Sequence, residues 1–120
     1  MKFEYNIIEK SSNQLKVHLP LNEDMDCFDG HFDQIAIMPA VAQLYIVEQI
    51  SKKHFKQLAG FERMNQVKFV APIFPDSIVV INIRIDFEKQ LVFFEYKDKD
   101  KEQLKSKGNI YYSRKQASNE

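Results

Sequence analysis

The fold of this chain is decided by residues 39–50, which read PAVAQLYIVEQI. Apolar side chains occupy Ala40, Val41, Ala42, Leu44, Tyr45, Ile46, Val47 and Ile50. A helix formed here is apolar on almost every side, and such a helix is buried rather than lying on a surface. Pro39 suits the first helical position, where no backbone N–H is needed. The pattern therefore predicts a buried helix from Pro39 to about Leu58, with Gly60 as its C-terminal stop.

Outside this helix, apolar and polar residues alternate with the period of a half-buried strand. The alternating segments are residues 3–7 and 14–19 before the helix, and residues 67–71, 79–87, 91–96 and 104–112 after it. A helix that is apolar all round needs a sheet that encloses it. We therefore expect an α+β fold in which a curved antiparallel sheet of about five to six strands wraps around one long central helix.

The length of 120 residues fits one domain. We place this domain at residues 1–113 and expect a disordered tail at residues 114–120. Its ten phenylalanines indicate a large aromatic core or an apolar pocket. Cys27 is the single cysteine, so the chain forms no internal disulfide.

Lysine plus arginine and aspartate plus glutamate number 17 each, which gives no electrostatic footprint for nucleic acid. The N-terminus lacks the apolar run of a signal peptide, and no segment reaches the roughly 18 apolar residues of a membrane span. A cytoplasmic location is the expectation. The spacing of the aspartates at residues 24–33 does not fit a calcium loop, and the histidines lack metal-ligand spacing, so we expect neither a metal nor a cofactor.

The chemistry is suggested by a histidine that comes shortly before the buried helix. Residues 28–32 read FDGHF and place His31 eight residues before Pro39. A helix N-terminus offers free N–H groups and a partial positive charge, which stabilise a carbonyl oxygen that gains negative charge. Histidine accepts a proton near neutral pH. A base beside such a site suits proton removal next to a thioester carbonyl.

These residues resemble the 3-hydroxyacyl-acyl carrier protein dehydratases of the hotdog superfamily. That family carries a Gly-His-Phe motif followed, eight residues after the histidine, by a proline. Gly30-His31-Phe32 and Pro39-Ala40-Val41 have this spacing, and residues 39–44 look most like the branch found in aryl polyene biosynthesis clusters. Residues 67–76 resemble a second strand-and-bend segment of the family.

The resemblance implies a hotdog fold, usually dimeric, and an acyl thioester substrate on the phosphopantetheine arm of an acyl carrier protein. The reaction would remove water from a 3-hydroxyacyl chain to give a trans-2-enoyl thioester, as in fatty acid or polyene-type lipid biosynthesis. His31 would take the proton from C2, and the N–H of Ala40 would polarise the carbonyl. Gly30, Phe32, Pro39 and Val41 would complete the substrate-binding site.

The resemblance implies an acid fourteen residues after the histidine, contributed by the helix of the partner subunit, and this position holds Tyr45 in this chain. A tyrosine can donate a proton or order a water, but it cannot act as a carboxylate. Glu48 lies three residues further on nearly the same helix face and could supply the acid instead. Ala40 stands where the family has glycine, and Asp33 and Ala36 stand where it usually has prolines.

Two other functions are compatible with this sequence. The same fold hosts acyl-thioester hydrolases, and a fold does not fix a function. The missing acid would also fit a noncatalytic acyl-binding subunit that pairs with an active hotdog homologue. The expected assembly is therefore a homodimer or such a heterodimer, joined through a sheet edge.

Overall fold

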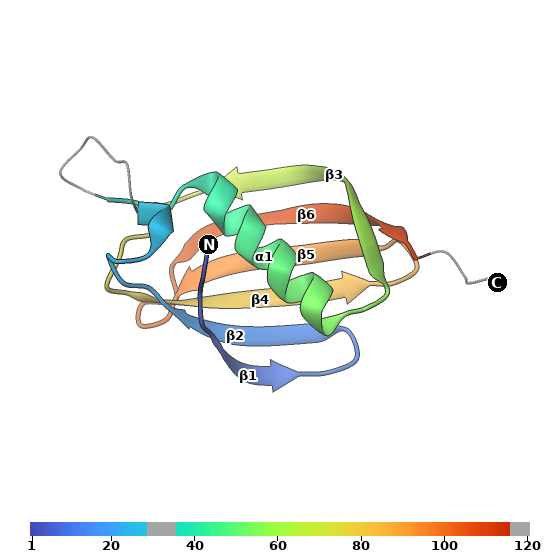
Figure 1. The fold of residues 1–120 in the computed structure, drawn as a ribbon, viewed down its shortest axis with the longest axis horizontal. Coiled ribbons are helices and arrows are strands. Elements are labelled where there is room, and N and C mark those ends of the chain that lie inside the picture. Colours follow the sequence, from blue (N-terminus) through green and yellow to red (C-terminus); the bar gives the residue numbers. More distant parts are fainter. Residues whose placement is uncertain (29–35, 116–120) are drawn as a thin grey trace.

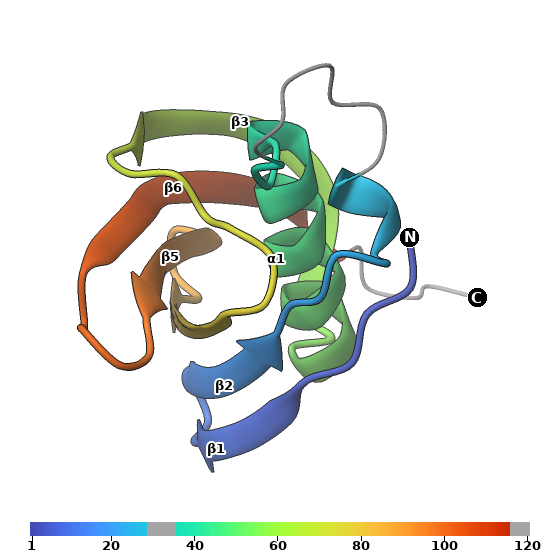
Figure 2. The same ribbon diagram turned by 90° about the vertical axis from the view of Figure 1, so that its left-hand side faces the viewer.

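The computed structural model describes residues 1–28 and 36–115. It has one antiparallel sheet of six strands in the order β1-β2-β4-β5-β6-β3, with the helix α1 lying across its concave face (Figures 1 and 2). The elements are β1 (Asn6–Lys10), β2 (Gln14–Pro20), the short 3-10 helix η1 (Asp26–Phe28), α1 (Ala40–His54), β3 (Leu58–Phe69), β4 (Ile78–Asp86), β5 (Leu91–Asp98) and β6 (Leu104–Arg114). The predicted order of two strands, one long helix and four strands is confirmed.

The core lies between α1 and the inner face of the sheet. Along β4, Val79, Ile81, Ile83 and Ile85 are buried and alternate with half-buried or exposed residues. The helix packs onto this face with Ala42, Gln43, Ile46, Val47, Ile50 and Ser51. Each large aliphatic side chain buried in this way stabilises the fold by about 1.5–3 kcal/mol.

The composition of the helix predicts that it is enclosed on every side, but the structure leaves one face open. Val41 is 77% exposed and Tyr45 is 39% exposed. The sheet curls around one side of α1 and leaves the other side open (Figure 2). The apolar residues of the helix therefore fall into two groups, one buried in the core and one exposed at the surface.

The end of the helix also differs from the prediction. The helix stops at His54, where Phe55 adopts an extended conformation (φ −128°, ψ 90°) while its N–H still bonds the Ser51 carbonyl. Leaving the helix here buries both Phe55 and Leu58, which are 3% and 1% exposed. Gly60 lies within β3 and is not a helix stop; its N–H donates to Ser113 Oγ at 2.9 Å.

The first strand is displaced from its predicted place. The strand β1 covers Asn6–Lys10 rather than residues 3–7, and all five of its residues are exposed. Phe3 and Tyr5 instead pack against the core from a segment that leads into the strand. At the other end of the domain, β6 runs through Arg114, one residue past the predicted boundary. No helix in the described part of the chain is long and apolar enough to cross a membrane.

Candidate active site

The N-terminus of α1 is open. Pro39 is extended (φ −64°, ψ 153°), and the first bond of the helix runs from the Gln43 N–H to the Pro39 carbonyl at 3.1 Å. Within the described residues, no side chain caps this end. The amides of residues 40–42 therefore point out of the first turn, where the helix dipole is positive. Such amides stabilise an oxygen that becomes negatively charged.

The predicted substrate-binding residues are described only in part. Pro39, Ala40 and Val41 lie at this open end, and both Ala40 and Val41 are exposed. The predicted base His31 and its neighbours Gly30 and Phe32 lie outside the described residues. The described part of the site is thus the N-terminal end of α1 and the surface around it.

The two candidate acids lie on one face of α1. Val41, Tyr45 and Glu48 are spaced by four and three residues, so they share the face of the helix that points away from the core. Glu48 is half-buried and forms an ion pair of 4.0 Å with Lys52, one turn further along. Tyr45 is three residues nearer to the open end of the helix.

The helix α1 contacts the edge strand β3. Burial raises the pKa of the Tyr112 hydroxyl above its ordinary value, and the negative charge of Glu48 raises it further. The Tyr112 ring in turn meets Phe61 of β3 edge-on, with ring centroids 6.5 Å apart. The buried Tyr112 ring therefore lies near both Glu48 of α1 and Phe61 of β3.

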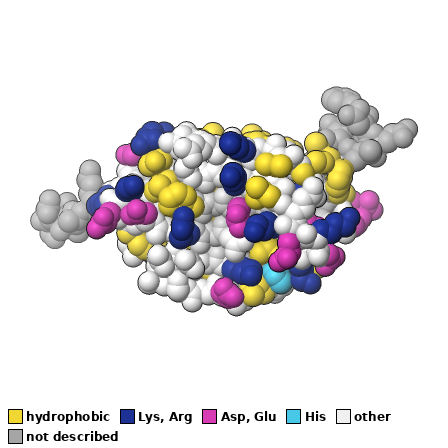
Figure 3. Space-filling model, turned by 180° about the vertical axis from the view of Figure 1, so that it is seen from behind, with side chains coloured by type: hydrophobic (Ala, Val, Ile, Leu, Met, Phe, Trp, Pro, Cys, Tyr) yellow, Lys and Arg dark blue, Asp and Glu magenta, His cyan; other side chains and the backbone are white. Residues whose placement is uncertain are grey.

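This surface carries many exposed apolar side chains. We call the following set the apolar border: Val41, Tyr45, Phe61, Met64, Phe69, Val70 and Phe74, each of which is exposed. It covers the open face of α1, the strand β3 and the segment that follows it. Hydrophobic side chains gather along the upper edge of the molecule, where β3 runs (Figure 3).

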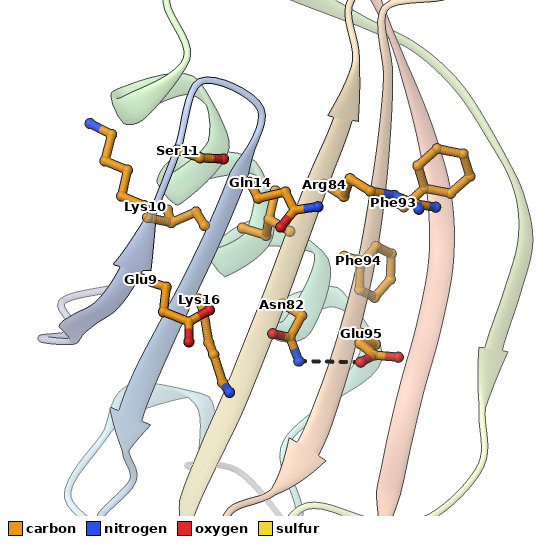
Figure 4. Close-up of a pocket in the computed structure, with 12 residues that line it drawn as sticks. Glu9, Lys10, Ser11, Gln14, Lys16, Asn82, Arg84, Phe93, Phe94 and Glu95 are labelled. Carbon is orange, nitrogen blue, oxygen red and sulfur yellow. Dashed lines mark hydrogen bonds between the residues drawn. The ribbon is translucent and has the colours of Figure 1, made fainter.

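A cavity of about 390 Å³ lies on the outer face of the sheet, away from α1. Its walls include Lys16 of β2, Asn82 and Arg84 of β4, and Phe93 and Glu95 of β5 (Figure 4). Asn82 donates to Glu95 at 3.2 Å, and the Arg84 guanidinium lies 4.5 Å from the centre of the Phe93 ring. None of the predicted site residues that the structure describes lines this cavity.

Gln43 is a buried polar residue beneath the site, and its sequence pattern predicts no functional role for it. The Gln43 side chain is 4% exposed, and its amide bridges Ser106 of β6 and the Met38 carbonyl. The hydroxyl of Tyr96 donates to the Gln43 carbonyl at 2.6 Å, and burial raises the pKa of that hydroxyl well above its ordinary value. The signal in the sequence was a single amide on the buried face of an apolar helix.

Comparison with solved structures identifies the fold. The structure described as the dehydratase heterocomplex ApeI:P from Xenorhabdus doucetiae superposes with a TM-score of 0.86 at 26% identity, covering 95% of this chain and 100% of that one. An uncharacterised protein from Erwinia carotovora subsp. atroseptica gives 0.79 at 24% identity, with coverages of 95% and 98%. Thioesterase superfamily member 2 from Mus musculus gives 0.68 at 16% identity, with coverages of 88% and 78%. The fold is the hotdog fold, as predicted.

Sequence comparison identifies the family. No curated protein matches the chain. Residues 7–109 match the family described as ApeI-like, ApeI dehydratase. This match covers most of the chain and includes the whole of α1 and the apolar border. The resemblance to the aryl polyene branch is thereby confirmed, and the chain belongs to the ApeI-like dehydratase family.

Proposed function

We propose that this chain is a dehydratase that removes water from a 3-hydroxyacyl thioester to give a trans-2-enoyl thioester. The substrate would be carried on the phosphopantetheine of an acyl carrier protein in the cytoplasm, in fatty acid or polyene-type lipid biosynthesis. Membership of the ApeI-like family carries the proposal. The open N-terminus of α1, with Tyr45 on the exposed face of the same helix, supports it.

The proposed reaction divides its steps among three groups. The imidazole of His31 takes a proton from C2, and the electron pair of that C–H bond forms the new double bond. The hydroxyl at C3 leaves with a proton from an acid and becomes water. The N–H of Ala40 stabilises the negative charge that develops on the thioester oxygen, as an open helix N-terminus is suited to do.

Tyr45 is our choice for the acid. Tyr45 occupies the position of the family's acid, whereas Glu48 lies about 4.5 Å further along the helix at a rise of 1.5 Å per residue. Glu48 is also engaged with Lys52. A phenolic hydroxyl can donate its proton to a leaving hydroxyl.

We further propose that the active form is a dimer joined through β3. This strand forms one edge of the sheet and is 12 residues long, while the strand at the opposite edge, β1, has five. A long edge strand with exposed apolar residues favours pairing with another chain. Such pairing would cover the apolar border and bring a second chain to the open face of α1.

The second candidate function is that of a noncatalytic acyl-binding subunit in a hotdog heterodimer. Tyr45 at the position of the family's acid favours it, because a tyrosine cannot act as a carboxylate. The similar structure from Xenorhabdus doucetiae is described as a heterocomplex. In this case the partner would contribute the catalytic acid.

The test is to incubate the purified protein with a 3-hydroxyacyl carrier protein and to follow the loss of one water by mass spectrometry. We expect turnover by the wild type and none by His31→Ala. Equal rates for the two would refute the proposed mechanism. Release of free thiol in place of water would identify a thioesterase. Tight acyl binding without turnover, with activity gained in Tyr45→Asp, would identify the noncatalytic subunit.

A further inference from the structure

The buried amide of Gln43 joins the first turn of α1 to the sheet. Its Oε1 accepts a hydrogen bond of 2.6 Å from Ser106 Oγ, and its Nε2 donates to the Met38 carbonyl at 3.3 Å. Ser106 is fully buried and Gln43 is 4% exposed. Because both ends of the amide have partners inside the protein, the side chain is held in one orientation.

The neighbouring strands β5 and β6 each donate a hydrogen bond to Gln43. Tyr96 of β5 and Ser106 of β6 are directly paired across the sheet and both reach Gln43. The Tyr96 hydroxyl donates to the main-chain carbonyl of Gln43, and the Ser106 hydroxyl donates to its side chain. The first turn of the helix is therefore attached to the floor of the sheet through one residue.

Gln43 fixes both peptide groups on either side of Pro39. Its side chain binds the Met38 carbonyl, whose residue is also held by a bond of 2.8 Å from the Met38 N–H to Ile73. Its main-chain N–H binds the Pro39 carbonyl. A trans peptide is planar, with its N–H opposite its C=O. The main-chain bond is the ordinary first bond of the helix, so it fixes the Ala40 N–H only relative to the first turn of α1. The side-chain bonds to Met38 and Ser106 then fix that turn relative to the sheet.

We propose that Gln43 is a positioning residue that aims the Ala40 N–H at the substrate carbonyl, through its bonds to Ser106, Met38 and Pro39. This inference rests on the proposed function, in which that N–H stabilises the thioester oxygen. The Pro39 ring restrains φ, so orientation depends on how the flanking peptides are held. A small misplacement of such a group lowers the rate of the chemical step more than it lowers substrate binding.

The test uses the double variant Gln43→Met, Ser106→Ala. Methionine keeps the length and helix preference of glutamine, and removal of both polar side chains leaves neither the Gln43 amide nor the Ser106 hydroxyl without the other. The Met38 carbonyl loses the donor that the proposed role assigns to it. We expect a kcat about tenfold below the wild type, with KM within about twofold. The order parameter of the Ala40 amide, measured by ¹⁵N relaxation, should fall from the rigid value of about 0.85 toward about 0.6.

The matched control is Ser51→Ala, which removes another fully buried serine hydroxyl from the same helix. The Ser51 hydroxyl has no hydrogen-bond partner among the described residues, so this variant should leave the Ala40 order parameter and kcat unchanged. The single variant Ser106→Ala should lower both in the same direction as the double variant, by less. It tests the inference even where the double variant does not fold.

The outcomes separate this inference from the proposed function. A wild type without dehydratase turnover refutes the proposed function, while the order parameter still reports on Gln43. An Ala40 amide that stays equally rigid in both variants refutes the positioning role. A more mobile amide with unchanged kcat refutes it too.

Discussion

Tyr45 is the residue that we propose as the acid of the reaction. It occupies the place of the family's acid, is 39% exposed, and shares the open face of α1 with Glu48. We expect Tyr45→Phe to lower kcat about 10²-fold, because a general acid contributes at least that much, while Glu48→Gln changes kcat less than about fivefold. Steady-state kinetics on a 3-hydroxyacyl thioester measures both. The reverse order of effects would assign the acid role to Glu48.

Gly108 shows a second kind of constraint, one of space. A Cβ at this position would lie 2.8 Å from Val67 Cγ2 and 2.9 Å from Phe94 Cε2. We expect Gly108→Ala to lower the free energy of unfolding by about 1–3 kcal/mol through overpacking. At Gly60 a Cβ would meet Ser113 Oγ at 3.5 Å, an ordinary contact, so Gly60→Ala should stay within about 0.5 kcal/mol of the wild type. Urea unfolding compares the two, and equal losses would contradict the packing argument.

The sequence predicts the site residues only where the local pattern is strong. Motif spacing predicts Pro39, Ala40 and Tyr45 as site residues. The structure places Pro39 and Ala40 at the open end of α1 and Tyr45 more than one turn further along the helix. Gln43 stands in the same motif without a predicted role, because its partners Ser106 and Met38 reach it only in the folded chain. A contact over 63 residues leaves no trace in local periodicity.

At the scale of elements, the segment before β1 is tied to the C-terminal end of α1. The Tyr5 hydroxyl and His54 Nε2 are 2.7 Å apart. Burial lowers the pKa of the His54 imidazole, and the positive charges of Lys10, Lys53 and Lys56 lower it further. The folded state therefore binds this proton less tightly than the unfolded state.

This pKa gives a signed pH dependence. The stabilisation from neutral His54 is present above the ordinary histidine pKa of about 6.5 and is lost as the pH falls through the lower folded-state pKa. NMR titration of the His54 ring should give a midpoint below about 6.5, and Lys10→Gln should raise that midpoint. A wild-type midpoint at or above the ordinary value would contradict this reasoning.

Strand and helix types are predicted well, and their ends less so. Strands β2, β4, β5 and β6 follow clean alternation because one face is buried. The first half of β3 does not alternate, because it lies at an edge where both faces are largely exposed. Its start at Leu58 and the early end of α1 depend on burying Phe55 and Leu58, a tertiary effect that propensity does not contain.

At the scale of the whole molecule, the two edges of the sheet differ in what they expose. Met64 on β3 and Ile8 on β1 are 46% and 45% exposed, which makes them a matched pair. We expect Met64→Lys to convert a dimer into single chains, because it places a charge in the apolar border, while Ile8→Lys leaves the dimer intact. Light scattering gives the mass of each. Dissociation by Ile8→Lys alone would move the interface to β1.

The strand order has a consequence for how the chain is made. β3 follows α1 directly in the sequence but pairs with β6, so that Leu58 lies opposite Arg114. During synthesis, β3 cannot pair within the sheet until β6, which is separated from it by two strands in the sequence, has also been made. Pairing of such distant segments is slow, and an unpaired strand invites aggregation. Folding of this domain is therefore completed only after β6 has been synthesised, and a chain that stopped before β6 would leave β3 without its neighbour in the sheet.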